Sequence, residues 1–330
     1  MTRLSLFWVP VVAVVMMTIA TALGPRGSIS TLISRDPVEA RILRDVRLPR
    51  VSLGFISGAA LAAAGMAFQA LFRNALATPY TLGVSAGASL GAAIAVHLGV
   101  TATIGGIAGS SFAAFAGALA SIAIVYCVAR TAPGFSTAGL LLAGVAVSFI
   151  FTSAILAIQY MGDVTTSFRT GRWLLGGLEV VGFDPVFQVV PFAAVGIGVL
   201  VVIARDLDLL TAGDESAATR GVNVATVKRV VFVSASLMVG GVVAICGPIG
   251  FVGLIVPHVG RMLVGPRHRA LLPFSAVVGG TFLVACDALA RIVVAPVEIP
   301  VGIITALIGG PCFLAMLVKG HTRQRVGGLA

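Results

Sequence analysis

Charged residues are scarce in this chain. Asp, Glu, Lys and Arg make up 10 % of its 330 residues, whereas 58 % are hydrophobic and the mean hydropathy is +1.08. A soluble domain carries about 25 % charged residues. A chain with so few polar groups cannot cover its own surface in water. The composition therefore excludes a soluble protein and predicts one that crosses a lipid bilayer many times.

Motifs that hold nucleotides or metals are also missing. A P-loop needs Gly-Lys followed by Ser or Thr, but the only two lysines, Lys228 and Lys319, each follow a valine. There is no H-E-x-x-H or C-x-x-C motif, and the four histidines and four cysteines are scattered. We therefore expect no cofactor, ATP or metal site in this chain. Any ATP-driven motor would be a separate polypeptide.

Long apolar runs dominate what is present. A helix needs about 20 apolar residues to cross a hydrocarbon core roughly 30 Å thick, and continuous runs favour helices over a barrel. Ten candidate spans lie at about residues 4–24, 48–71, 83–105, 107–129, 138–161, 185–204, 227–247, 250–264, 270–294 and 299–319. They predict an all-α integral membrane protein that forms one polytopic domain over residues 1–330.

Basic residues predict how the chain is oriented. Ten crossings would place both termini on one side, and thirteen Lys and Arg lie on that side against nine on the other. The positive-inside rule then puts the termini in the cytoplasm. Six of the nine outer arginines lie in residues 25–50. This outer Arg-rich loop departs from the rule, which makes it a candidate functional site.

The first apolar run has two interpretations. Arg3 and the sequence Ala20-Thr21-Ala22 resemble the charged start and the cleavage site of a signal peptide. The run is about 20 residues long, which exceeds the usual apolar core of such a signal. We therefore favour a retained helix.

The stretch LGVSAGASLG, residues 82–91, contains G-x-S-x-G around Ser85, the spacing of a hydrolase nucleophile elbow. An elbow needs a strand before the serine, but here a polar turn precedes it and an apolar run follows. We interpret these glycines, and the pair Gly54 and Gly58, as sites of close helix packing. An intramembrane serine hydrolase that uses Ser85 is the disfavoured alternative.

Seven stretches, taken in order, resemble the permease subunits of iron-chelate and vitamin B12-type ABC importers, the type II importers. They are RLPR (47–50), GAALAAAGMAFQALFRNALATPYTLGVSAGASLG (58–91), GLLLAG (139–144), GDESAATRGVNV (213–224), GPIGFVGLIVPHVGRMLVG (247–265), CDALAR (286–291) and EIPVGIITALIGGPCFL (298–314). One departure is Ala75, which stands where the family usually has proline, and it leaves the shape of that turn open.

The resemblance implies the type II ABC importer permease fold, with ten transmembrane helices in a bacterial cytoplasmic (inner) membrane. It implies a second permease subunit, identical or different, two ATPase subunits that bind ATP and Mg, and an extracytoplasmic substrate-binding protein. Nucleic acid is not an expected partner. The cargo would be a metal chelate, with ferric siderophore first and haem or a corrinoid as alternatives. The chain would move it by alternating access and would not itself be an enzyme.

The resemblance also implies roles for particular residues. Those expected to dock the binding protein are Arg47, Arg50 and Arg291. Those expected to couple to the ATPase lie in a cytoplasmic loop over 205–226 and are Gly213, Glu215, Ala217 and Gly221; Ala217 and Ala218 favour a short helix there, which Gly221 would end. Those expected at the cytoplasmic gate are Ser136 and Thr137. The alternatives are local ion pairs, an ordinary surface loop and helix capping, respectively.

Three further features concern polar residues in apolar surroundings. Asp287 precedes Arg291 by four residues, which predicts an ion pair on one helix; in an ion-coupled secondary transporter, the alternative function, Asp287 would instead carry a proton. His258 and Arg261 share a helix face and are predicted to make hydrogen bonds between helices. Residues 165–179 are expected to form an amphipathic outer helix, with Trp173 at the membrane boundary.

Overall fold

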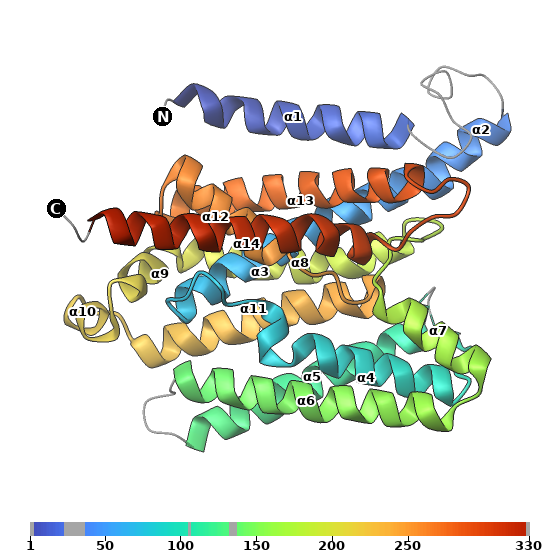
Figure 1. Ribbon diagram of the computed structural model, residues 1–330, viewed down its shortest axis with the longest axis horizontal. Helices are drawn as coiled ribbons and strands as arrows, with labels where there is room; N and C mark the ends of the chain where they lie inside the picture. Colours follow the sequence, from blue (N-terminus) through green and yellow to red (C-terminus); the bar gives the residue numbers. More distant parts are fainter. Residues whose placement is uncertain (1–2, 23–36, 105–106, 132–136, 328–330) are drawn as a thin grey trace.

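The protein is a bundle of helices that run roughly along one long axis (Figure 1). The computed structural model describes residues 3–22, 37–104, 107–131 and 137–327. Its ten apolar helices are α1 (Arg3–Ala22), α3 (Leu48–Leu71), α4 (Val84–His97), α5 (Gly109–Thr131), α6 (Thr137–Met161), α8 (Asp184–Val202), α11 (Val224–Cys246), α12 (Val252–Val264), α13 (His268–Ile292) and α14 (Val301–Gly327). Each corresponds to one predicted span.

Shorter elements join these helices. They are α2 (Pro37–Ile42), a π-helical turn (Leu43–Arg47), a 3-10 helix (Pro79–Leu82), α7 (Val164–Leu174), α9 (Ala204–Thr211), α10 (Asp214–Thr219) and the antiparallel strands β1 (Thr103–Ile104) and β2 (Ile107–Ala108). We call the two ends of the bundle the α7 end and the α10 end. Helix α1 begins and α14 ends at the α10 end, as an even number of crossings requires (Figure 1).

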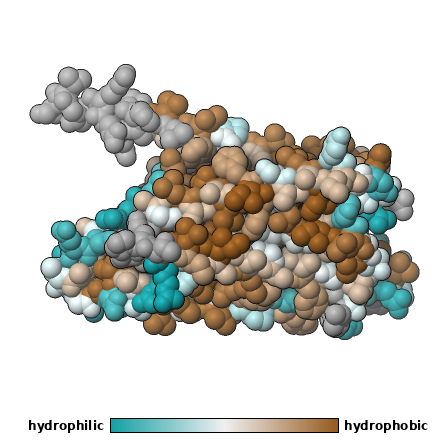
Figure 2. Space-filling view, turned by 90° about the horizontal axis from the view of Figure 1, so that it is seen from below, coloured by the Kyte–Doolittle hydropathy of each residue, from teal (hydrophilic) through white to brown (hydrophobic). Residues whose placement is uncertain are grey.

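The surface is divided as a membrane protein requires. Six helical segments are long and apolar enough to cross a membrane, and α1, α4, α12 and α14 contribute shorter apolar segments. The space-filling view shows hydrophobic residues over the middle of the molecule and hydrophilic residues gathered toward its ends (Figure 2). A hydrocarbon belt between two polar ends is the pattern of a bundle that spans a bilayer.

The core is built around α3. The helical segment Pro37–Leu71, which ends with α3, has 83 % of its 18-residue apolar stretch buried inside the protein. The corresponding stretch of α6 is 22 % buried. A Cβ at Gly58 would collide with the backbone of Gly279 on α13, and one at Gly65 with the backbone of Gly253 on α12. Backbones can approach this closely only where both residues are small. The predicted packing role of Gly58 is therefore confirmed.

The serine of the G-x-S-x-G pattern lies in the first turn of α4 and is buried. A 3-10 helix precedes it in place of the strand that a nucleophile elbow needs, and Gly83 joins the two with φ +76°. A Cβ at Gly87 would collide with the backbone of Gly117 on α5. These small residues bring α4 and α5 together, as predicted.

The prediction of a helix over 83–105 was wrong at its end, because α4 stops at His97. Gly99 adopts φ +65°, its N–H bonds the carbonyl of Val96, and the Val100 N–H bonds that of Ala95. This is the Schellman arrangement that ends helices. Glycine is so frequent in this chain, at 40 residues, that one particular glycine does not stand out as a stop signal.

The outer loop predicted over 25–50 was wrong for its second half. Residues 25–36 lie outside the described residues, but 37–50 are helical and continue into α3. Pro49 lacks the N–H that would bond the carbonyl of Asp45. The Gly182 N–H bonds that carbonyl instead, at 2.7 Å. The helix therefore continues through Pro49, because Gly182 supplies the hydrogen bond that the proline cannot make. From the sequence alone, this proline indicates the end of a helix.

Candidate functional site

Each end of α3 carries an arginine in a cluster of charges. At the α7 end the Arg50 guanidinium donates two hydrogen bonds to Oδ1 of Asp287 on α13, from Nε at 3.0 Å and from Nη2 at 2.9 Å. Its Nη1 donates to Oε2 of Glu298 at 2.6 Å. Arg50 is 8 % exposed and Asp287 2 %. The two carboxylates therefore satisfy a buried cation by charge-assisted hydrogen bonds.

Two more arginines join this cluster. Arg291 Nε lies 3.2 Å from Oδ2 of Asp287, so the predicted ion pair on one helix is confirmed. Its Nη2 donates to the carbonyl of Ala20 at 2.9 Å. Arg47 Nη1 donates to the carbonyls of Thr21 (3.3 Å) and Ala22 (3.1 Å). The last carbonyls of a helix have no partner within it, and here two arginines from other helices supply partners for α1.

The structure thus brings together Arg47, Arg50 and Arg291, the three arginines that the sequence suggested for docking. Two of them, Arg50 and Arg291, are buried, whereas Arg41 and Arg44 are exposed on the preceding helical turns. Sequence reasoning missed Glu298. Its only signal was a lone carboxylate shortly before the last apolar run.

Next to the cluster, the α7 end is hollowed. A cavity of about 860 Å³ is lined by residues that include Arg172, Glu179 and Glu298. Arg172 and Glu179 form an exposed ion pair at 2.7 Å. At the start of α7, Asp163 accepts the backbone N–H of Thr166 at 2.7 Å, and bonding to Thr166 lowers the pKa of this carboxyl. Helix α7 ends at Leu174, earlier than the predicted 179.

At the α10 end, Asp214 connects three elements. It accepts from Nζ of Lys228 on α11 at 2.5 Å and lies 3.7 Å from Nη2 of Arg73, just beyond α3. Lys228 is buried, whereas the side chains of Asp214 and Arg73 are 39 % and 44 % exposed. The loop predicted over 205–226 therefore holds two short helices, α9 and α10. Asp214 ties α10 to Arg73 and to α11, whereas Asp208 ties α9 to His268 of α13, with Oδ1 2.8 Å from the backbone N and 2.6 Å from Nδ1.

Helix α10 has the form predicted for the coupling segment. It covers Asp214–Thr219, Gly213 precedes it with φ +121°, and Gly221 follows with φ +83°. The Gly221 N–H bonds Ala218 and the Val222 N–H bonds Ala217, which is again the Schellman arrangement. Ala217 is buried and Glu215 is exposed. The helix projects from the end of the bundle (Figure 1), and Ala217 is its buried residue.

The turn that follows α3, in which Ala75 replaces the proline usual in the family, also lies at the α10 end. Arg73 adopts φ +48°, and Asn74 Oδ1 accepts the Leu76 N–H at 2.9 Å. The Asn74 side chain holds the turn, so its shape does not depend on a proline at Ala75. Of the two gate candidates, Thr137 is the half-buried first residue of α6, and Ser136 falls outside the described residues.

His258 and Arg261 of α12 were predicted to make hydrogen bonds between helices. For Arg261 the prediction is confirmed, because this residue donates to Oε1 of Gln69 on α3. Gln69 Nε2 in turn donates to the carbonyls of Gly253 and Leu254 at 3.2 Å each. Gln69 was missed, although an amide in an apolar span is itself a signal of contact between helices. Within the described residues, no group of three or more His, Cys, Asp or Glu is placed to hold a metal.

The fold, the apolar belt and the polar clusters at both ends define a membrane-spanning transport permease. Residues 6–319 match the FecCD transport family, and the chain belongs to that family. It is 44 % identical over 284 residues to a cobalamin import system permease of Halobacterium salinarum, which covers 86 % of this chain and 74 % of the relative. It is 38 % identical over 287 residues to a Fe(3+)-citrate import system permease of Bacillus subtilis, covering 86 % and 83 %.

A solved structure supports the same assignment. It is an inward-facing conformation of a metal-chelate type ABC transporter, 30 % identical in sequence, with a TM-score of 0.88 over 96 % of this chain and 100 % of that one. The predicted family and fold are therefore confirmed, and the chain is a permease of the ABC importer class.

Proposed function

We propose that this chain imports a metal chelate, a ferric siderophore in the first place, across a bacterial cytoplasmic membrane by alternating access. The observation that carries the proposal is the match of residues 6–319 to the FecCD transport family. Relatives are named for the import of cobalamin and ferric citrate and the transport of hemin, so haem and a corrinoid are the other cargoes to test. The termini and the α10 end face the cytoplasm in this proposal, and the α7 end faces outward.

The partners follow from what the chain lacks. It contains no P-loop, so ATP and Mg bind to two separate ATPase subunits. Gly213, Glu215, Ala217 and Gly221 couple to them, because α10 projects at the cytoplasmic end and exposes Glu215. A second permease subunit, identical or different, completes the pathway, and Ser136 and Thr137 close it on the cytoplasmic side.

An extracytoplasmic binding protein docks at the α7 end. Arg47, Arg50 and Arg291 carry the positive charge there, and Arg41 and Arg44 extend it to the surface. Arginine pairs well with carboxylates, so acidic residues of the binding protein are the expected partners. Because Glu298 is the more exposed carboxylate on Arg50, at 26 % against 3 % for Asp287, it is the partner that an incoming carboxylate displaces.

The alternative, proton-coupled transport through Asp287, is not favoured. A proton carrier must be reached by protons from water, but Asp287 is 2 % exposed and both of its carboxylate oxygens contact arginine side chains, those of Arg50 and Arg291. This carboxylate is better explained as a structural partner of the α7-end arginines.

The test is co-expression with neighbouring genes, purification, and uptake into proteoliposomes of labelled ferric siderophore, haem and cobalamin. We expect an ATPase to co-purify and uptake to need ATP. Glu215→Arg should lower uptake at least tenfold, whereas Asp184→Arg, an exposed carboxylate reversed at the other end, should leave ATPase binding intact. Uptake driven by a proton gradient without nucleotide would overturn the proposal.

A further inference from the structure

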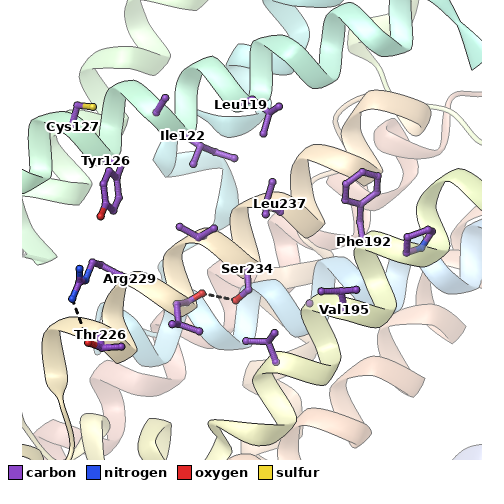
Figure 3. A pocket seen from close by; sticks show the side chains of 16 residues that line it. Leu119, Ile122, Tyr126, Cys127, Phe192, Val195, Thr226, Arg229, Ser234 and Leu237 are labelled. Atoms are coloured by element: carbon purple, nitrogen blue, oxygen red, sulfur yellow. Dashed lines mark hydrogen bonds between the residues drawn. The ribbon is translucent and has the colours of Figure 1, made fainter.

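An apolar groove lies on the side of the bundle between α5, α8 and α11, and none of the residues of the two charge clusters lines it. Its volume is about 1020 Å³. Helices α5 and α8 each pack along α11, but the described residues show no extended packing of α5 on α8. Helix α11 therefore forms the floor of the groove, and α5 and α8 form its walls (Figure 3).

The groove is closed at one end and polar at the other. Phe192 of α8 meets Phe115 of α5 with ring centroids 5.0 Å apart, so the two walls come into contact at this end. At the opposite end lie Tyr126, Thr226 and Arg229 (Figure 3). The floor between them exposes no unsatisfied hydroxyl, because Ser234 Oγ donates to the Val230 carbonyl at 2.7 Å.

The charge of the groove has one sign. Arg229 is exposed, and no carboxylate is among the residues that line the groove. Its Nε donates to the Ala225 carbonyl (3.1 Å) and its Nη2 to Oγ1 of Thr226 (3.3 Å), which hold the guanidinium at the mouth. Nη1 takes part in neither bond. A guanidinium at the mouth of an apolar slot is complementary to a phosphate that carries a hydrocarbon chain.

The length of the groove fits half a bilayer. On α11 it runs from Thr226 to Leu237, which at 1.5 Å per residue is about 16 Å. One leaflet contributes roughly half of a 30 Å hydrocarbon core. A tyrosine at the polar end also suits the boundary between hydrocarbon and headgroups.

We propose that the groove between α5, α8 and α11 binds one anionic diacyl phospholipid, with an acyl chain on the α11 floor and the phosphate on Arg229. The polar end of the groove lies where α11 begins, at the α10 end, so the phosphate would lie in the cytoplasmic leaflet. This choice of leaflet rests on the orientation in the proposed function; the site itself does not. A bound lipid would fill the space between α5 and α8 and join two helices that otherwise meet at the Phe115–Phe192 ring contact.

Cys127 offers a direct readout, because this free and exposed thiol lines the groove, while Cys312 on α14 is exposed elsewhere. The full chain in detergent is alkylated with a maleimide in the presence of phosphatidylglycerol, phosphatidylcholine or inorganic phosphate. We expect phosphatidylglycerol to slow the reaction of Cys127 at least threefold and to leave Cys312 unchanged, with no effect of the other two. Equal rates with all three additions, or equal protection by phosphate alone, would overturn the proposal.

Matched variants separate this site from general lipid contact. Arg229→Gln should lose the protection and reduce phosphatidylglycerol retained in native mass spectrometry at least fivefold, while Arg205→Gln, an exposed arginine of α9, should stay within twofold. Val233→Trp fills the groove and should also abolish the effect; Val201→Trp, on the exposed surface of α8 outside the groove, should not.

Two results would contradict the site even in well-folded protein. One is equal loss of lipid from the Arg229 and Arg205 variants. The other is a disulfide between Cys127 of two copies on mild oxidation, which would show that a second copy covers the groove. Neither readout requires transport, so failure of the proposed import function would leave this test valid.

Discussion

The two ends of α3 hold their arginines in opposite ways. Arg50, at the α7 end, is buried against Asp287 and shares it with Arg291. Arg73, at the α10 end, is 44 % exposed and lies 3.7 Å from a carboxylate that is 39 % exposed. Charges removed from water depend on their partners, whereas exposed pairs contribute about 0–1 kcal/mol.

The two ends of α3 are therefore held with different strength. The α7 end is fixed by several buried bonds that join α1, α3 and α13, whereas at the α10 end the projecting helix α10 is joined to Arg73 and Lys228 through one half-exposed carboxylate, that of Asp214. A permease driven from the α10 end would need its weak connections there. The following substitutions test this difference, from the largest expected effect to the smallest.

Asp287→Asn should cause the largest loss of stability. It removes the charge that balances buried Arg50 and Arg291, and breaking a buried ion pair costs about 3–5 kcal/mol. Thermal unfolding in detergent, followed by the fraction that remains monodisperse, measures the effect. Asp184→Asn, an exposed carboxylate at the start of α8, is the control. Unchanged melting of Asp287→Asn would mean that the α7 end is not the rigid one.

Gly65→Ala should destabilise by about 1–3 kcal/mol, because the added methyl group forces α3 away from the Gly253 backbone. The same melting assay applies. Gly171→Ala on α7 is the matched control, since a Cβ there meets nothing within 4 Å. If both variants melt alike, the central packing of α3 tolerates separation and is not what holds the bundle.

Asp214→Asn should cost less, on the order of 1–2 kcal/mol, because Asp214 is 39 % exposed and balances one buried cation, Lys228, whereas Asp287 lies between two buried arginines. ATP-dependent uptake should fall far more than stability does. The comparison is with Asp287→Asn at matched protein levels. A melting shift as large as that of Asp287→Asn would remove the contrast between the two ends.

Arg73→Gln should have the smallest effect, about 0.5 kcal/mol or less, because its ion pair is long and exposed. The loss should also shrink as salt is added, since exposed pairs are screened. Melting curves at low and high ionic strength check both points. A large effect that is independent of salt would show that Arg73 is part of a buried connection.

The sequence predicted the spans well because apolar length is a local property that the membrane thickness sets directly. It also found the pair Asp287 and Arg291, which are one helical turn apart. It could not find Arg50 with Asp287, which lie 237 residues apart, or Lys228 with Asp214, because neither pairing follows from helical spacing. Docking, coupling and gating remain predictions for the residues named above.

The end of α1 depends on a residue that is synthesised much later. The Ala20 carbonyl is bonded by an arginine that follows it by 271 residues. Arg47 follows α1 closely and can bond the Thr21 and Ala22 carbonyls early, but the Ala20 carbonyl lacks its partner until the ninth span has been synthesised. A nascent chain stopped before Arg291 should hold its first helix loosely, and membrane proteases should recognise and remove it faster than the finished protein.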